Sequence, residues 1–259
     1  MVTAIEPPQP TCKKMSPNQR IVTAVSAAVF AIALSSSMPL SGADAVKCVC
    51  QPVDLLKNAT LDDFDFFLMD NGKKEDSFSL TADGVLHLTG EPKGWLGTKK
   101  DYRNFIFTSE FRYPKPEIKT NSGLLVRIGE QKKTTFLPHC VEIQLQTGDC
   151  GTLYAFHDFV ISGDKTLMKS FPNHEFAGNC TSVTKFRDAQ NYEDLSWNKL
   201  EIHCNEDLLI VKINGKVVNW AIMAEIKPGK IAFQSEGGPI EFKNALLTVL
   251  PYLSFPDLG

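Results

Sequence analysis

The chain lacks the short motifs that mark several large enzyme classes. It contains no Gly-x-Ser-x-Gly nucleophile elbow, no phosphate-cradling glycine loop and no His-Glu-x-x-His metal motif. Each of these motifs holds a particular reacting group, namely an exposed serine, a phosphate or a zinc ion. Their absence removes the sequence support for acyl transfer, nucleotide chemistry and zincin-type hydrolysis.

The sequence also has little net charge and no basic cluster. Its 259 residues carry a formal net charge of −3, and the pI is about 6.0. A nucleic-acid groove requires clustered lysine and arginine, because phosphate contacts supply much of its affinity. We therefore expect no nucleic-acid partner, infer no protein partner, and expect a neutral or weakly polar small molecule as the ligand.

Long apolar runs are missing as well. The most apolar segment, residues 21–34, is short for a bilayer span, follows three basic residues and gives way to serines. Ala43-Asp44-Ala45 then supplies a small-x-small cleavage site. We predict a signal peptide over residues 1–45, export to the periplasm or the extracellular space, and no stable membrane insertion after cleavage. A retained membrane anchor is the alternative, and Met15 is a second candidate start.

Six cysteines remain after cleavage, and an even number in an exported chain favours disulfides, although the sequence does not choose their pairing. A zinc site is the rival interpretation, but Cys48-Val49-Cys50 has one intervening residue where zinc motifs have two. No cofactor is indicated with certainty, and a divalent metal stays open. The six are Cys48, Cys50, Cys140, Cys150, Cys180 and Cys204.

Short strands dominate the mature chain. Residues 105–113 keep three phenylalanines on one face until Pro114 stops strand pairing, and Asn214-Gly215 joins two apolar runs as a tight hairpin. Many short strands and almost no helix predict an all-β fold, an antiparallel two-sheet β-sandwich of jelly-roll type. We expect an N-terminal segment at residues 46–59, with one short turn within 53–67, and the sandwich at 60–253. The expected strands also include residues 84–90, 200–204, 208–213, 217–219, 230–234, 240–244 and 246–250, with a long loop over 157–196.

Two of the period-two runs carry polar residues that we expect on one sheet face. In residues 141–146 the apolar residues point to the core, so Glu142, Gln144 and Gln146 point outward. In residues 121–127 the same alternation places Arg127 beside Glu142, where it lowers a carboxyl pKa or holds an oxyanion. Carboxylate and amide groups suit a polyhydroxyl ligand, because each hydroxyl both donates and accepts hydrogen bonds. A solvated strand face with a surface ion pair is the alternative.

Other candidate site residues come from neighbouring segments. Gln234 and Glu236 repeat the outward pattern before two glycines, so a second carboxylate is available for acid–base chemistry. Tyr154 is a candidate for stacking on a sugar or donating its hydroxyl. His157, next to an aspartate, is a candidate base or metal ligand, and Trp95 a candidate sugar platform. A solvated histidine and a core tryptophan are the simpler alternatives.

The order of these pieces resembles the 3-keto-disaccharide hydrolase domain family, formerly a domain of unknown function, whose fold is similar to concanavalin A-like lectins and glucanases. The resemblance covers roughly residues 60–250 and also brings Asn121 into the expected sugar site. Family members often carry a histidine where this chain has Glu236, so a metal site or base built on that histidine is not carried over. The segments that carry the resemblance are residues 94–102, 107–112, 121–123 with Arg127, 142–144, 151–154, 197–198, 214–215 and 233–244.

This resemblance implies cleavage of glycosides whose glucose unit is oxidised at carbon 3. The ketone acidifies the hydrogen on carbon 2, so a base such as Glu142 or His157 removes it while Arg127 or an amide steadies the enolate. The carbon 1 substituent then leaves by elimination, and water adds back. A non-catalytic, lectin-like carbohydrate-binding module is the alternative function. An ordinary endo-glucanase requires two acids close together on one strand, and glutamines follow Glu142 instead.

Overall fold

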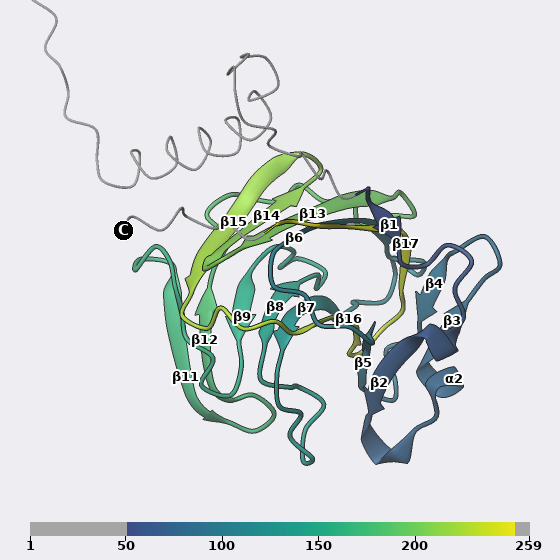
Figure 1. Cartoon of the computed structure of the whole chain (residues 1–259), viewed down its shortest axis with the longest axis horizontal. Coiled ribbons are helices and arrows are strands. Elements are labelled where there is room, and N and C mark those ends of the chain that lie inside the picture. Colours follow the sequence, from purple (N-terminus) through teal and green to yellow (C-terminus); the bar gives the residue numbers. More distant parts are fainter. Residues whose placement is uncertain (1–50, 252–259) are drawn as a thin grey trace, which may run out of the picture. The chain divides into compact units, whose positions relative to one another are not determined.

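The computed structural model describes residues 51–251, which form two stacked antiparallel β-sheets (Figure 1). One sheet has nine strands. The predicted all-β, two-sheet sandwich is confirmed. In sheet order the nine-stranded sheet contains β10 (Ile161–Ser162), β15 (Lys216–Met223), β14 (Leu208–Ile213), β13 (Asn198–Asn205), β6 (Phe105–Arg112), β17 (Ile240–Val249), β4 (Leu86–Leu88) and β3 (Phe78–Leu80), while β1 (Val53–Asp54) pairs with β17.

The other sheet has eight strands and forms the opposite layer in Figure 1. Its central strands come from two distant parts of the chain, because β16 inserts between β5 and β7. In sheet order it contains β11 (Met168–His174), β12 (Gly178–Val183), β9 (Leu153–Ala155), β8 (Val141–Gln144), β7 (Gly123–Ile128), β16 (Lys230–Ser235), β5 (Gly94–Thr98) and β2 (Phe64–Leu68).

Helical structure within residues 51–251 is limited to three short elements. They are the 3-10 turns η1 (Leu61–Asp63) and η2 (Met69–Asn71) and the single turn α2 (Lys74–Ser77). The turn expected within residues 53–67 is therefore η1, and β2 follows it directly. No helix in this part of the chain is long and apolar enough to cross a membrane.

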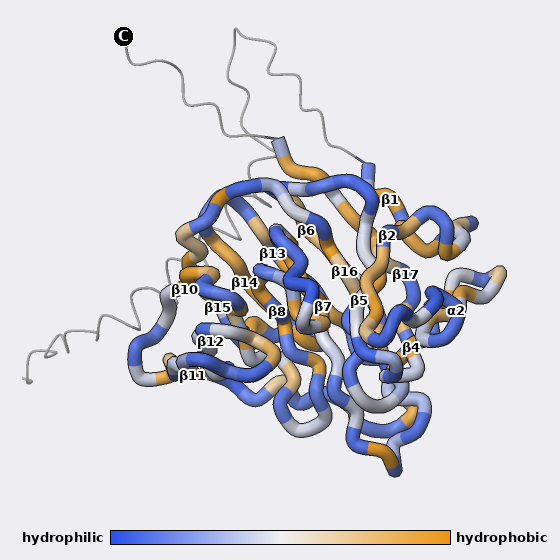
Figure 2. The backbone as a smooth tube through the Cα atoms, turned by 90° about the horizontal axis from the view of Figure 1, so that it is seen from below, coloured by the Kyte–Doolittle hydropathy of each residue, from blue (hydrophilic) through white to orange (hydrophobic). Residues whose placement is uncertain are grey.

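Alternation along the strands separates two apolar clusters. In β7, Leu124 and Val126 pack in the core between the sheets, while Leu125 belongs to a smaller cluster with Trp95 and Ala232. The smaller cluster therefore lies on the outer face of the eight-stranded sheet, the face turned away from the other sheet. Figure 2 shows hydrophobic colours along strands such as β14 and β16 and mainly hydrophilic ones along β11.

The structure corrects two strand predictions. Residues 240–244 and 246–250 were expected as two strands, but β17 runs through both. A register shift between Lys243 and Leu246 and a positive φ of 52° at Asn244 allow the continuation. The expected loop over 157–196 instead contributes β10, β11 and β12, which extend both sheets at one edge.

The four cysteines in the described part of the chain are buried free thiols, so the predicted disulfides do not form among them. Cys150 and Cys204 lie in the core between the sheets, whereas Cys140 and Cys180 belong to the outer cluster. The predicted signal peptide, Cys48 and Cys50 lie outside the described residues.

Candidate functional site

A pocket of about 300 Å³ opens on the outer face of the eight-stranded sheet. Strands β8, β9 and β12 contribute to its lining, and so does β11 at the sheet edge. We call it the carboxylate pocket, because it holds two glutamates. It is lined by Asn121, Leu137, Glu142, Gln144, Tyr154, Phe156, Phe171, His174, Ala177, Cys180 and Glu236.

Glu142 is the deepest ionisable group in this pocket. It stands between Val141 and Ile143, which are both in the sandwich core, so its side chain points to the outer face and is still only 2% exposed. Gly123 on β7 makes room for it, since a Cβ atom there would lie 2.4 Å from Glu142 Oε1. Burial raises the pKa of Glu142 well above its ordinary value, and the nearby charge of Glu236 raises it further.

Glu236 follows the last residue of β16 and is less deeply buried. The Gln234 amide donates a hydrogen bond to Glu236 Oε2 at 3.1 Å. Burial raises the pKa of Glu236 to about 7, while the ammonium group of Lys93 opposes this rise. Because the charge of Glu236 also disfavours ionisation of Glu142, the two carboxyl groups lose their protons one after the other.

Three buried oxygen atoms at this site have no hydrogen-bond partner. They are Asn121 Oδ1, Glu142 Oε1 and Gln234 Oε1, and they are the only such side-chain oxygens within residues 51–251. Two of them border the same glycine, because a Cβ atom on Gly123 would also lie 2.9 Å from Gln234 Oε1. Buried acceptors normally have partners, so this group is suited to a ligand that brings hydrogen-bond donors.

Gln144 and Tyr154 complete the polar lining. The Gln144 side-chain oxygen accepts a hydrogen bond from the backbone N–H of Gln146 at 2.9 Å, which leaves its amide nitrogen as a donor for a ligand. The Tyr154 hydroxyl donates to Asp149 at 3.3 Å, and burial with this carboxylate raises the tyrosine pKa. Gln146 itself does not line the pocket, because β8 ends before it.

Arg127 does not join the carboxylate pocket, contrary to the prediction. Its guanidinium donates to three backbone carbonyl groups, from Lys227 at 2.8 Å, Glu206 at 2.6 Å and Arg103 at 3.1 Å. The register of β7 against β16 shifts here, and Arg127 has a φ of 55°. Such a bulge breaks the strict alternation on which the prediction depended and redirects the side chain.

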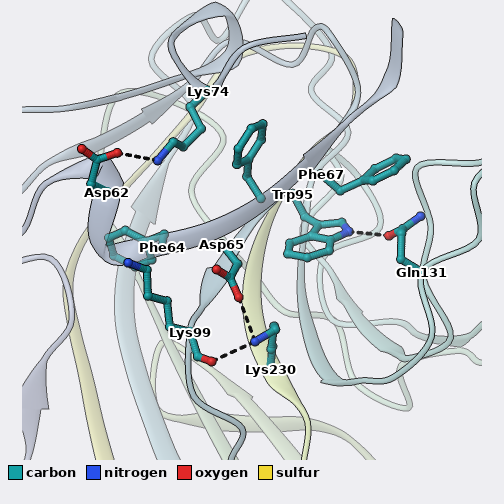
Figure 3. A pocket seen from close by; sticks show the side chains of 10 residues that line it. Asp62, Phe64, Asp65, Phe67, Lys74, Trp95, Lys99, Gln131 and Lys230 are labelled. Atoms are coloured by element: carbon teal, nitrogen blue, oxygen red, sulfur yellow. Dashed lines mark hydrogen bonds and ion pairs between the residues drawn. The ribbon is translucent and has the colours of Figure 1, made fainter. Parts of the chain in front are cut away.

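His157 and Trp95 also lie outside this pocket. His157 contacts the carbonyl oxygen of Leu137 through Nε2 at 2.9 Å, and burial lowers its pKa. Trp95 is 5% exposed, and its indole N–H donates to Gln131 at 2.8 Å. Trp95 lines a neighbouring cavity instead (Figure 3).

Three residues near the carboxylates were not predicted from the sequence. Phe171 and His174 come from β11, in the segment that was expected to be a loop. Lys93 precedes β5 and lies over the rings of Phe136 and Phe176, at 5.3 and 5.8 Å from their centres. Gly178, where β12 begins, is a sequence signal for the turn between β11 and β12. Pro172 and the polar residues of β11 weaken the strand signal before it, so the hairpin was not predicted.

Metal ligation by this site was left open by the sequence. Within residues 51–251, no group of three or more histidine, cysteine, aspartate and glutamate side chains is arranged to hold a metal ion. The chemistry that the pocket itself offers is proton transfer between two carboxyl groups with different pKa values, beside amide donors and unpartnered acceptors.

A family model described as the 3-keto-alpha-glucoside-1,2-lyase-like domain matches residues 55–248. No curated protein shows significant similarity to the chain. A candidate glycosyl hydrolase from Parabacteroides distasonis superposes with a TM-score of 0.53 at 17% identity, over 78% of this chain and 94% of that chain. The carbohydrate-binding module CBM66 from Bacillus subtilis gives a TM-score of 0.50 at 12% identity, over 74% of this chain and 98% of that chain. At these identities each of the two structures shares only its fold with this chain.

Proposed function

Because the chain belongs to the family of 3-keto-alpha-glucoside-1,2-lyase-like domains, we propose that it cleaves glycosides whose glucose unit carries a ketone at carbon 3. The observation that carries this proposal is the pair Glu142 and Glu236, two buried carboxyl groups with raised pKa values in one pocket. Two carboxyl groups that differ in pKa suit a reaction that removes one proton and delivers another.

The unpartnered oxygens support a polyhydroxyl substrate. Asn121, Glu142 and Gln234 present acceptors with no partner, and sugar hydroxyl groups are donors of the required kind. A volume of about 300 Å³ is at the lower end of the range for small-molecule pockets. We therefore place the oxidised sugar ring, rather than the whole glycoside, in the carboxylate pocket.

The two glutamates take different roles. Glu236 ionises at a lower pH than Glu142, since its pKa is about 7 and the Lys93 ammonium favours its charged form. We assign it as the base that removes the proton from carbon 2. Glu142 keeps its proton to higher pH because it is fully buried beside Glu236, and we assign it as the acid.

The elimination balances with the substrate and the two carboxyl groups alone, and hydrolysis then consumes one water molecule. Glu236 takes the carbon 2 proton, and the electron pair of that C–H bond forms an enolate with the carbon 3 ketone, which the Gln144 amide steadies by donating a hydrogen bond. The enolate oxygen then re-forms the carbon 3 ketone, the carbon 2–carbon 3 electron pair becomes a carbon 1–carbon 2 double bond, the carbon 1–oxygen bond breaks, and Glu142 protonates the leaving oxygen. Water then adds its hydroxyl group to carbon 1 and gives a proton to Glu142, while Glu236 returns its proton to carbon 2, so the net reaction is hydrolysis and both carboxyl groups regain their starting states.

The decisive experiment compares Glu236→Gln and Glu142→Gln with the unmodified protein on a 3-keto-glucoside and on its unoxidised parent. Glutamine keeps the shape of the side chain but cannot exchange the proton, so we expect turnover of the keto substrate to fall by about 10²–10⁴-fold. Glu241→Gln is the matched control, because this glutamate pairs with Arg112 in the other sheet. Cleavage of the parent glycoside alone would refute the keto-dependent mechanism.

A carbohydrate-binding module is the second candidate, and the unpartnered acceptors support it equally well. The two functions differ in one measurement. A protein that binds the 3-keto-glucoside by calorimetry but leaves it intact over many hours is a binding module. Turnover that is lost in Glu142→Gln while binding persists identifies the enzyme.

We also propose that the protein is exported, with cleavage after Ala45. The support is the sequence pattern of residues 1–45, in which basic residues precede an apolar segment and a small-x-small site. Expression of the full chain in a secreting host, followed by N-terminal sequencing of the mature protein, tests this proposal. A mature chain that still begins at Met1 or Met15 would contradict it.

A further inference from the structure

The β11–β12 hairpin forms one wall of the carboxylate pocket, and none of the proposed acid–base roles uses it. It lies at the edge of the eight-stranded sheet and extends beyond it on the side turned away from the nine-stranded sheet (Figure 1). Phe171 and His174 of β11 line the pocket, together with Ala177 in the turn and Cys180 in β12. The hairpin therefore encloses a ligand on a side that carries neither of the two glutamates.

Phe171 presents an aromatic ring to this pocket. It is the cross-strand partner of Cys180, which belongs to the outer apolar cluster, and residues directly opposite each other share a sheet face. Phe171 is 38% exposed, whereas Cys180 beside it is 6% exposed. An accessible aromatic ring in a pocket wall is suited to contact with the C–H groups of a ligand.

A bulge brings His174 to the same wall. The register of β11 against β12 shifts between Phe171 and His174, and Asn173 has a φ of 52°. Strict alternation would put residues three apart on opposite faces, so the bulge allows both side chains to line the pocket. The backbone N–H of Phe176 donates to His174 Nδ1 at 3.3 Å, so the neutral imidazole carries its proton on Nε2. The wall thus offers a hydrogen-bond donor beside an apolar ring.

Hydrogen bonds hold the hairpin in place. The backbone N–H of Asn173 donates to Asn179 Oδ1 at 3.1 Å, and the Asn179 amide donates to Asp158 at 2.8 Å. From the loop between β7 and β8, the Thr135 hydroxyl donates to the carbonyl group of Phe176 at 2.6 Å. A wall that is ordered before the ligand binds contributes to specificity at a small cost in conformational entropy.

The position of the hairpin decides which part of the sugar it contacts. Strands β9 and β12 separate β11 from β8, which carries Glu142, and neighbouring strands lie roughly 5 Å apart. The proposed chemistry places carbons 1 and 2 at Glu142 and Glu236. The opposite edge of a six-membered sugar ring contains carbons 4 and 5, and carbon 5 bears the hydroxymethyl group of carbon 6. In a pocket of about 300 Å³ that holds one ring, this opposite edge is turned toward the hairpin.

On the basis of the proposed function, we propose that Phe171 and His174 recognise the hydroxymethyl group at carbon 6 of the oxidised ring. The methylene carbon packs against the ring of Phe171, and His174 Nε2–H donates a hydrogen bond to the hydroxyl oxygen. The protein then prefers 3-keto-hexosides to 3-keto-pentosides. Both residues determine specificity and take no part in proton transfer.

Two substrates with the same leaving group test this inference. They are a 3-keto-glucoside and the matching 3-keto-xyloside, in which a hydrogen atom replaces the hydroxymethyl group. Phe171→Ala should lower kcat/KM for the glucoside by about three- to tenfold, because it removes one aromatic contact. The xyloside lacks the group that Phe171 contacts, so its kcat/KM should change by less than about twofold. Tyr192→Ala, which removes an exposed aromatic ring from outside the carboxylate pocket, is the matched control.

Two variants of His174 test the hydrogen bond separately. His174→Ala should lower kcat/KM for the glucoside by about two- to tenfold and leave that for the xyloside nearly unchanged, because it removes one donor. His174→Gln keeps a donor and should restore most of the loss. An alanine variant that affects both substrates equally, or a glutamine variant as impaired as alanine, would contradict the assigned donor.

The unmodified protein provides a further measurement that needs no variant. Its kcat/KM should be at least about tenfold higher for the glucoside than for the xyloside, which lacks both the methylene and the hydroxyl group. Equal values for the two substrates, or equal effects of Phe171→Ala on both, would overturn the recognition of carbon 6. Failure of the unmodified protein to cleave either substrate would instead overturn the proposed function.

Discussion

The outer faces of the two sheets differ in whether their buried carboxylates have hydrogen-bond partners. On the nine-stranded sheet, Glu241 accepts from Arg112 at 2.5 Å and contacts His87 at 2.8 Å, although its side chain is only 7% exposed. On the eight-stranded sheet, Glu142 is equally buried but has an oxygen without a partner. A buried carboxylate that is fully paired contributes to a rigid surface, whereas one that lacks a donor is available to a ligand.

This contrast separates residues that stabilise the fold from residues that are kept for chemistry. Burial without a partner costs free energy, and proteins tolerate such a cost mainly at functional sites. The raised pKa values of Glu142 and Glu236 reflect this cost, because burial disfavours the charged form of each carboxyl group. Substitutions on the two faces should therefore have opposite consequences for turnover and stability.

The largest effect is expected from Gly123→Ala. The added Cβ atom would meet Glu142 Oε1 at 2.4 Å and Gln234 Oε1 at 2.9 Å, so the carboxylate must move. We expect turnover of a 3-keto-glucoside to fall by about 100-fold or more, because a misplacement of about 1 Å in an active site has this consequence. Gly129→Ala, whose Cβ atom would approach only His139 at 3.3 Å, is the control. Full activity in Gly123→Ala would show that the position of Glu142 is unimportant.

Arg112→Met should have the reverse profile. The substitution removes the donor at 2.5 Å from the nearly buried carboxylate of Glu241 and leaves that charge poorly compensated. Losing one partner of a buried pair is strongly destabilising, and with Arg112 itself 32% exposed we expect a loss of about 2 kcal/mol in the free energy of unfolding. Denaturant titration measures this loss, and turnover at a temperature where the variant is folded should be unchanged. A large loss of activity would contradict the separation of the two faces.

The pH dependence of stability should reveal Glu236. Its carboxyl group titrates near 4.5 in the unfolded chain and near 7 in the folded one, so between these values the folded state binds more protons. The contribution of Glu236 to the free energy of unfolding is then fully present below about pH 4.5, and it is lost as the pH rises to about 7. Glu236→Gln should remove this fall, and its advantage over the unmodified protein should grow to about 3 kcal/mol by pH 8. Thermal unfolding at pH 5, 6.5 and 8 tests this, and a constant difference across the series would contradict it.

The smallest expected effect is that of Lys93→Met. The ammonium group of Lys93 opposes the rise of the Glu236 pKa, so its removal should raise this pKa above about 7. Because the ionised carboxylate is the proposed base, the acidic limb of the kcat/KM profile should move to higher pH by about half to one unit. Lys132→Met, which removes a lysine paired with Glu130 at 2.8 Å, should leave the limb in place. A shift to lower pH would show that another group titrates.

Regular alternation explains which parts of the site were predictable. The predicted faces of Glu142, Gln144 and Gln234 depend on strands β8 and β16, where core residues alternate with outward ones. A two-residue period is enough to assign such positions to a face. The sandwich fold was predictable for the same reason, because most of its strands repeat this period between glycine and proline turns.

Departures from that period explain the rest. Arg127 lies at a register shift and has a positive φ, and no feature of the sequence of residues 121–127 predicts this shift. Strand β11 is exposed along nearly its whole length and contains Pro172, so neither face carries an apolar signal. The unpartnered oxygens depend on the meeting of β7, β8 and β16, which are brought together only by the tertiary fold.

Because its four described cysteines are buried free thiols, the stability of the domain should depend little on the redox conditions around it. Cys140, Cys150, Cys180 and Cys204 are each covered by neighbouring side chains, and burial raises the thiol pKa of each of them. Thiols in this condition react slowly with oxidants and contribute to packing as small apolar groups. Residues 51–251 are thus held by apolar packing and backbone pairing without covalent cross-links among these cysteines, so strong reductants should leave their cooperative unfolding unchanged.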